Sequence, residues 1–222
     1  METPGRRKVL QCTTFAVSLP LAGCLGGSGD DEQGGTRSET PGTAVDPAEL
    51  TGSIRPSGDP RAVPEPLSCD DPAFTRFDLS GRNDGFAWGN LSEDGTPTFA
   101  LRTSDLSVSY GDDVSITLTN LQAQKATTTH RDYFNVELYT TQGWQEVRGW
   151  KQGTPRPYPS IEVGHRPGDG FEWKLTFSGD SLVEEHIHES SLTVCPGLPA
   201  GRYRFVYRGL EKAVAVAFDL AK

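Results

Sequence analysis

The sequence has no hydrophobic run long enough to cross a bilayer, and it contains few cysteines, few lysines and a single methionine. The longest mostly apolar segment, residues 9–22, is 14 residues long, whereas a membrane-spanning helix needs about 20. Gln11, Ser18 and Pro20 also interrupt it. We therefore do not expect this segment to be a transmembrane helix.

The residues around that segment indicate export. Arg6, Arg7 and Lys8 precede it, and paired arginines before a short apolar run are typical of a twin-arginine signal. Residues 21–24 read Leu-Ala-Gly-Cys, which resembles the lipobox of exported lipoproteins. We therefore predict a signal peptide over residues 1–23, lipidation of Cys24 and anchoring on the extracellular face of the cell membrane. The alternatives are a plain secretory signal with an incidental Cys24, or retention in the cytoplasm.

The composition changes again beyond the cysteine. Residues 24–67 are rich in Gly, Ser, Thr, Pro, Asp and Glu and have almost no apolar periodicity, which is typical of a chain that cannot build a core. We predict a lipidated, disordered tether over residues 24–67 and one folded domain over residues 68–222.

Basic residues are scarce. The chain has 21 Lys and Arg against 30 Asp and Glu, a net charge of −9, and loss of residues 1–23 removes three of the bases and one acid. Nucleic acid is therefore not expected as a partner, because phosphate binding needs clustered Lys and Arg. For the same reason, electrostatic attachment to an anionic membrane is not expected. The low lysine content, the acidity, the twin-arginine signal and the lipobox together resemble haloarchaeal exported lipoproteins. In such proteins the acidic surface would serve solubility.

The four cysteines have separate predicted fates. Cys12 leaves with the signal peptide and Cys24 takes the lipid, so Cys69 and Cys195 remain as a predicted disulfide of an exported protein. A reduced pair is the alternative. A thiol redox role is not expected, because no Cys-x-x-Cys spacing is present.

Apolar and polar residues alternate with a period of two in most of the remaining chain. A hairpin turn is expected near Gly143, where a positive φ is needed. No long helical period competes, so we predict an all-β fold, an antiparallel sandwich of about seven strands. The runs are residues 99–101, 106–110, 112–120, 133–140, 171–178, 201–208 and 213–220.

Between about residue 106 and residue 220, a Gly-Asp turn before a strand is followed by a Gly-Trp pair, a Pro-Gly turn and a Gly-x-Tyr-Arg motif. Motifs in this order resemble those of the bacterial and archaeal Ig-like domains of surface lipoproteins. The resemblance implies an Ig-like β-sandwich, and it is silent about catalysis and ligands. Cys195 precedes Tyr203, unlike the cysteine of antibody domains, so a staple from the N-terminal segment to a late strand is expected. The positions that carry the resemblance are Gly111, Asp112, Asn120, Gly143, Trp144, Val147, Pro167, Gly168, Gly201, Tyr203 and Arg204.

One cluster, Glu184 to Ser190, contains two histidines that suit a metal. On a strand, His186 and His188 would share a face and could both bind zinc or copper. However, Ser181 and Glu184 have the spacing of a helical capping box, and on a helix the two histidines would diverge. No third ligand is evident. A solvated acidic loop is the favoured interpretation.

Arginines and tryptophans form two further groups of candidate binding residues. Arg202, Arg204 and Arg208 fall on the outward side of one strand, where they could meet an acidic partner, although ion pairs with Glu137 or Glu172 are the simpler expectation. The four tryptophans could form a carbohydrate platform, but core or edge packing is favoured. They are Trp88, Trp144, Trp150 and Trp173.

Asn90 begins the glycosylation sequon Asn-Leu-Ser, in a stretch expected to be a loop. No nucleophile elbow, Cys/His pair or phosphate-binding loop is present, so no catalytic activity and no cofactor are expected. The favoured function is that of a membrane-anchored, non-catalytic interaction module that binds a surface protein or a glycan. The alternatives are a metal-handling lipoprotein that uses Glu184–His188, and a protease-inhibitor-like sandwich.

Overall fold

The computed structural model describes residues 42–82, 85–152 and 155–222. The predicted signal peptide, lipobox and Cys24 lie outside these ranges. No helix within them is long and apolar enough to cross a membrane.

The first main sheet has four antiparallel strands in the order β12-β6-β4-β3. Its inward residues include Ile116 and Trp173, which face each other across the β6–β12 pair. The alternating pattern seen in the sequence thus supplies one wall of the core. The strands are β3 (Asn90–Glu93), β4 (Thr96–Thr103), β6 (Asp113–Asn120) and β12 (Gly170–Thr176).

The second main sheet runs β2-β15-β14-β8-β9, with β5 also pairing with β15. Its central pairs are antiparallel, but β2 and β5 run parallel to β15. The sheet is thus antiparallel as predicted in its central strands, and two short parallel strands that precede β6 in the chain are added beside β15. The strands are β2 (Phe86–Trp88), β5 (Ser107–Ser109), β8 (Phe134–Thr140), β9 (Gly143–Glu146), β14 (Gly201–Tyr207) and β15 (Ala213–Ala221).

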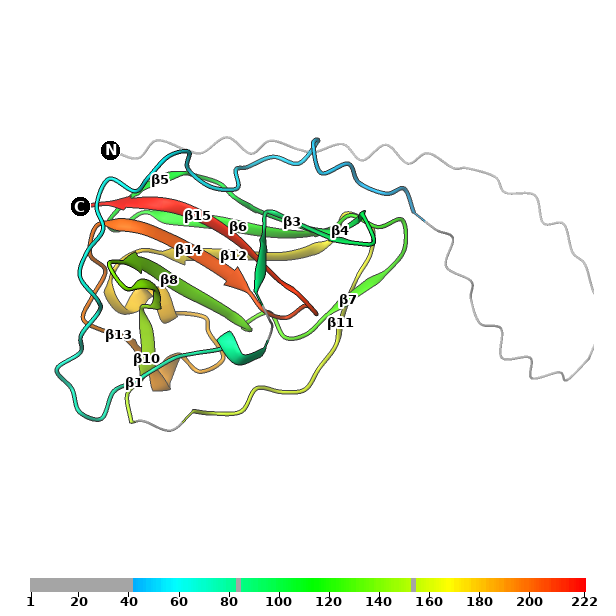
Figure 1. Ribbon diagram of the computed structural model, residues 1–222. Coiled ribbons are helices and arrows are strands. Elements are labelled where there is room, and N and C mark those ends of the chain that lie inside the picture. Colours follow the sequence, from blue (N-terminus) through cyan, green and yellow to red (C-terminus); the bar gives the residue numbers. More distant parts are fainter. Residues whose placement is uncertain (1–41, 83–84, 153–154) are drawn as a thin grey trace, which may run out of the picture. The chain divides into compact units, whose positions relative to one another are not determined.

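The two sheets enclose one main core, as Figure 1 shows with β8, β14 and β15 on one side and β6 and β12 on the other. Phe205 stacks on Phe134 at 4.7 Å between ring centroids and contacts Trp173 of the opposite sheet at 4.9 Å. Each aromatic ring removed from water in this way contributes roughly 1.5–3 kcal/mol. Burial of these side chains between the two sheets therefore stabilises the pairing of the strands.

Smaller elements close one end and one side of the sandwich. One three-stranded sheet has the order β1-β10-β13, and a two-stranded sheet joins β7 and β11. Within the described residues, three 3-10 helices lie in the connections. These elements are β1 (Thr75–Arg76), β7 (Ala126–Thr128), β10 (Arg148–Trp150), β11 (Val163–His165), β13 (Leu192–Val194), η1 (Ser80–Arg82), η2 (Gly179–Val183) and η3 (Glu189–Ser191).

The order of the strands is that of an Ig-like sandwich. The chain crosses from β6 in the first sheet to β8 in the second, returns to β12 beside β6, and crosses again to β14 beside β8. At the start of β14 the hydroxyl of Tyr203 donates a hydrogen bond to the carbonyl of Pro199 at 2.7 Å, which is the tyrosine-corner arrangement of such domains. The predicted fold class is confirmed.

The segment 42–67 belongs to the folded unit, so the prediction of disorder up to residue 67 is wrong for this part. It makes no continuous strand, which is why its sequence has no periodicity, yet its backbone is held at several separate points. Ile54 packs so closely on Gly89 that a Cβ there would lie 2.5 Å from it. The backbone bonds are Val45 N–H to Leu121, Ser53 with Thr103, Ala217 N–H to Ile54 and Thr141 N–H to Pro64, all between 2.8 and 3.0 Å.

Candidate functional site

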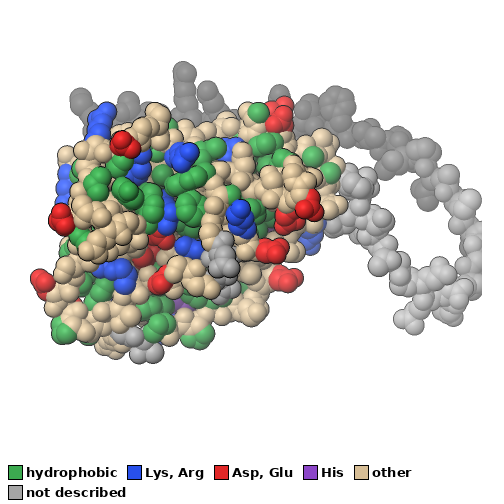
Figure 2. Space-filling view, in the orientation of Figure 1, with side chains coloured by type: hydrophobic (Ala, Val, Ile, Leu, Met, Phe, Trp, Pro, Cys, Tyr) green, Lys and Arg blue, Asp and Glu red, His purple; other side chains and the backbone are tan. Residues whose placement is uncertain are grey.

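A hollow of about 460 Å³ lies on the outer face of the six-stranded sheet. Figure 2 views the molecule in the orientation of Figure 1, and hydrophobic and basic side chains are interspersed over the face where β8, β14 and β15 lie in front. One wall of the hollow comes from the segment 55–60 and the floor from the sheet. The lining residues are Arg55, Pro56, Ser57, Gly58, Asp59, Pro60, Trp88, Tyr139, Trp144, Arg202 and Ala217.

Arg202 fastens the wall of the hollow to its floor. Its guanidinium donates to both carboxylate oxygens of Asp219 on β15, at 2.8 and 3.0 Å, and to the carbonyl of Gly58 at 2.7 Å. The hydrogen bonds to Asp219 raise the pKa of Arg202 above its usual value. Because this guanidinium is bound on two sides, the segment 55–60 is held against the sheet rather than left free.

Three aromatic side chains give the hollow its flat surfaces. Tyr139 and Trp144 lie opposite each other on β8 and β9, with ring centroids 5.1 Å apart, because the two-residue hairpin turn sets their register. Trp88 comes from β2 and contacts Phe86 edge-on at 4.9 Å. Within the described residues, the indole N–H groups of both tryptophans and the Tyr139 hydroxyl have no protein partner. These donors are therefore available to a ligand.

The predicted outward row of arginines forms ion pairs within the sheet, and those of Arg204 and Arg208 with Glu137 are buried. Arg204 binds Glu137 through Nε and its terminal nitrogen, and Arg208 donates to Asn135 at 2.7 Å. Burial raises the pKa of Glu137 and lowers that of Arg204, and the ion pair acts against both shifts. The predicted pairing with Glu137 is confirmed. Pairing with Glu172 is wrong, because Glu172 lies on β12 in the other sheet.

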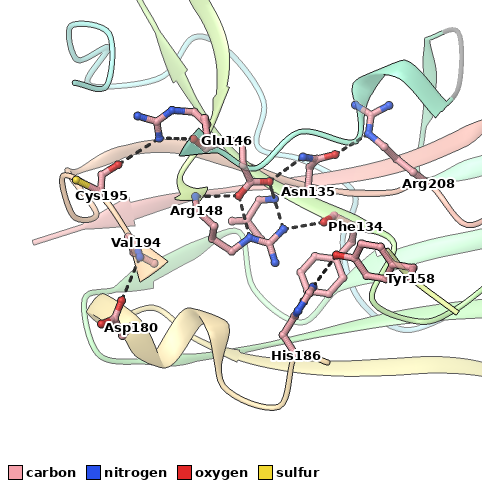
Figure 3. A network of polar contacts seen from close by, with 12 residues as sticks. Phe134, Asn135, Glu146, Arg148, Tyr158, Asp180, His186, Val194, Cys195 and Arg208 are labelled. Atoms are coloured by element: carbon pink, nitrogen blue, oxygen red, sulfur yellow. Dashed lines mark hydrogen bonds and ion pairs between the residues drawn. The ribbon is translucent and has the colours of Figure 1, made fainter. Parts of the chain in front are cut away.

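His186 and His188 lie in turns between η2 and η3, neither on a strand nor on a helix that would hold both. Figure 3 shows His186 pointing toward Tyr158, whose hydroxyl lies 3.1 Å from Nε2. Nδ1 of His186 accepts a hydrogen bond from the backbone N–H of His188 at 3.0 Å. Burial, with repulsion from Arg148 and His188, lowers the pKa of His186 to about 2.

This geometry does not fit the predicted metal site. Both ring nitrogens of His186 are hydrogen-bonded, and the lone pair of Nδ1, which would bind a metal, accepts the backbone N–H of His188. Among the residues that the structure describes, no group of three or more His, Cys, Asp or Glu side chains is arranged to hold a metal ion. His130 lies near Asp132, at 3.7 Å, and His165 is bound to Thr128 in a separate part of the fold. The acidic side chains Glu184, Glu185 and Glu189 are exposed, which agrees with the favoured interpretation of a solvated acidic loop, but His186 is buried.

A buried charge network lies beside this loop, also drawn in Figure 3. Arg148 is fully buried, and it donates to Glu146 at 2.8 Å and to the carbonyl of Phe134 at 2.7 Å. Its guanidinium also lies between the rings of Phe77 and Phe134, at 4.8 and 4.5 Å. The side-chain amide of Asn135 donates a further hydrogen bond to the carboxylate of Glu146. Among the described residues, Nη1 of Arg148 is buried without a hydrogen-bond partner, while Nε and Nη2 are both bonded. The bonds that are made hold strands β8, β9 and β10 together.

The remaining predicted site residues fall in different places. Cys69 and Cys195, the pair left over by the cysteine count, form a disulfide with 5.6 Å between their Cα atoms. It ties the N-terminal segment to the approach to β14. Asn90 is exposed, but it lies on strand β3 rather than in a loop, and its side-chain oxygen accepts from Arg102 at 2.9 Å. Cys24 lies outside the described residues.

Sequence reasoning missed the hollow because it assigned Arg55 and its neighbours to the tether. One signal was present, since the outward parity of Tyr139 and the hairpin turn together place it opposite Trp144. Trp88 carried no such signal, because β2 is only three residues long.

No protein-family model and no curated protein matches the sequence. Among solved structures, two crystal structures of a beta-glucosidase from Listeria innocua are similar to parts of this chain. The complex with glucose is 15% identical over 60% of this chain and 19% of its own, and the complex with gluconolactone is 13% identical over 72% and 22%. Both have a TM-score of 0.29. The chain thus spans about a fifth of the length of the solved proteins it matches.

Proposed function

We propose that the chain is a membrane-anchored extracellular lipoprotein whose Ig-like domain is a non-catalytic interaction module of the cell envelope. The observation that supports this most directly is the hollow on the outer face of the six-stranded sheet, with its three aromatic side chains. A volume of about 460 Å³ falls in the range of small-ligand sites, roughly 300–1,000 Å³. We propose this hollow as the site where a surface protein or a glycan binds.

The chemistry of the lining favours binding over catalysis. Its polar groups are mainly hydrogen-bond donors, namely the indole N–H groups, the Tyr139 hydroxyl and the Arg55 guanidinium. Ser57 and Asp59 line the wall, but no histidine is among the described residues around the hollow. A serine nucleophile is usually activated by a neighbouring base, most often a histidine, and no hydrogen bond joins Ser57 to Asp59 among the described contacts.

The location rests on the N-terminal sequence. The paired arginines, the apolar run and the lipobox support export and lipidation at Cys24. The disulfide between Cys69 and Cys195 also favours an oxidising compartment, since such bonds are rare in the cytosol. We therefore propose that the domain is held at the outer surface of the membrane by the lipid.

Photo-cross-linking on intact cells tests the proposal. A benzophenone amino acid in place of Tyr139 should capture a defined envelope component, and Trp144→Ala in the same chain should abolish the capture. The matched control carries the benzophenone in place of Tyr110, which is 48% exposed and does not line the hollow. If both positions capture the same mixture of abundant proteins, the interaction-module proposal is wrong.

A further inference from the structure

The aromatic rings of the hollow are fixed before any ligand arrives. The guanidinium of Arg204 lies 4.4 Å from the centroid of Trp144 and 4.6 Å from that of Phe86, so it is sandwiched between the two rings. Arg204 is itself buried and paired with Glu137. Because the ring of Trp144 rests on a fixed charge, binding would cost little side-chain entropy.

The rings also present the mixed surface that a sugar needs. A tryptophan or tyrosine offers a flat apolar face and one polar tip. A pyranose ring likewise has faces of C–H groups and a rim of hydroxyls that accept hydrogen bonds. Trp88, Tyr139 and Trp144 each leave the polar tip without a protein partner among the described residues. A saccharide could satisfy these three donors while its ring stacks on Trp144.

The two arginines that line the hollow differ in whether a carboxylate neutralises them. Arg202 is hydrogen-bonded to Asp219 and also feels the negative charge of Asp59. Arg55 instead lies over the ring of Trp88, with its guanidinium carbon 5.1 Å from the centroid. It has no carboxylate partner within the part of the chain that the structure describes. Asp59, the carboxylate of the lining, interacts with Arg202, so Arg55 is the cation of the lining that is left to meet an acidic ligand group.

We infer that the hollow binds an anionic saccharide, that is, a sugar bearing a carboxylate or sulfate group. The sugar ring stacks on Trp144, the aromatic N–H and O–H groups donate to its hydroxyls, and Arg55 pairs with its acidic group. This inference rests on the proposed function and adds the class of ligand. Charge-assisted hydrogen bonds of this kind are about twice as strong as neutral ones, so Arg55 would set the preference for acidic sugars.

Calorimetric titration of the purified full chain tests the inference. The probes are two oligosaccharides of equal length and linkage, one built from glucose and one containing glucuronic acid. We expect the acidic probe to bind at least about fivefold more tightly, and Arg55→Gln to remove that preference. Trp144→Ala should weaken both probes by about tenfold or more. Arg61→Gln, which removes a charge from the same segment outside this hollow, should change neither affinity.

Equal affinity for the two probes, or equal effects of Arg55→Gln and Arg61→Gln, would overturn the inference but leave an interaction module that binds neutral glycans. The absence of saccharide binding, with a protein still cross-linked in a Trp144-dependent way, would also overturn it and keep the proposed function. If neither saccharide binds and no cross-link depends on Trp144, both the inference and the proposed function fail.

Discussion

The hydroxyl of Tyr158 lies 3.1 Å from Nε2 of His186, inside a cluster of aromatic rings that includes Phe77 and Phe134. Since Nδ1 of His186 accepts from a backbone N–H, the ring carries its single proton on Nε2 and donates it to Tyr158. The histidine therefore joins the long loop after β10 to the turns after η2. It is a structural contact whose strength depends on pH.

The stability of the domain should fall in mild acid because of His186. Burial lowers its pKa in the folded state to about 2, whereas the unfolded chain titrates near the ordinary value of 6.5. The stabilising contribution is therefore complete above pH 6.5 and is lost as the pH falls toward 2. At about pH 5 the loss should reach about 2 kcal/mol, because each pKa unit corresponds to about 1.4 kcal/mol.

Urea unfolding at neutral pH and at about pH 5 measures this loss, with His186→Gln as the comparison. The variant is expected to be less stable at both pH values, but its stability should change by about 2 kcal/mol less between them. Parallel pH dependence in the two proteins would show that His186 does not titrate in this way.

Removal of the disulfide should strongly destabilise the domain. Cys69 and Cys195 are 126 positions apart, and cross-linking such a long loop reduces the entropy of the unfolded chain by an amount worth about 4–5 kcal/mol in the chain-entropy model. We expect the double variant Cys69→Ser/Cys195→Ser to lose about 2–5 kcal/mol of unfolding free energy. The reduced wild-type protein should behave in the same way, and an unchanged urea midpoint in both would contradict the prediction.

The buried pair of Arg148 and Glu146 should be sensitive to loss of one partner. Arg148→Met leaves the Glu146 carboxylate buried without its cation, so we expect a loss of about 3–5 kcal/mol. The double variant Arg148→Met/Glu146→Gln should regain part of it. The control is Lys174→Met, which breaks an exposed ion pair with Asp113 and should leave the denaturation midpoint unchanged. Similar effects of both single variants would argue against the buried network.

The tyrosine corner should contribute measurably to stability. Tyr203→Phe removes the hydrogen bond to Pro199 and leaves that carbonyl without its donor, at an expected cost of about 1 kcal/mol. Tyr139→Phe is the matched control, since its hydroxyl has no partner among the described residues. Thermal or urea unfolding of the two variants compares them directly, and equal stabilities would rule out a role for this bond.

The lipid anchor is tested by Cys24→Ser. Without a thiol the chain cannot accept the lipid, so we expect the protein in the medium rather than in the membrane fraction. We expect its circular dichroism to match that of the wild-type domain. Membrane retention equal to that of wild type would contradict the lipobox interpretation.

The alternating sequence predicted the long strands of the two main sheets well, but not most of the short ones. Residues 112–120 and 213–220 coincide with β6 and β15 almost to the residue, because a half-buried strand must alternate apolar and polar side chains. The docking of 42–67 could not be predicted in this way. Those residues are held by isolated backbone hydrogen bonds and by close contacts such as Ile54 on Gly89, and neither leaves a periodic pattern.

The sequence by itself determined the fold class and the predicted localisation. Alternating apolar and polar residues, turn residues and the N-terminal signal are all local patterns. Only the tertiary structure decided what the chemistry-bearing residues do. The hollow joins Arg55, Trp88, Trp144 and Arg202 from four separate segments, so it depends on strand order and register. His186 looks like a metal ligand in the sequence, but in the fold its burial and its two hydrogen bonds make it a structural residue. Burial and partners are properties of the assembled core, and no short stretch of sequence contains them.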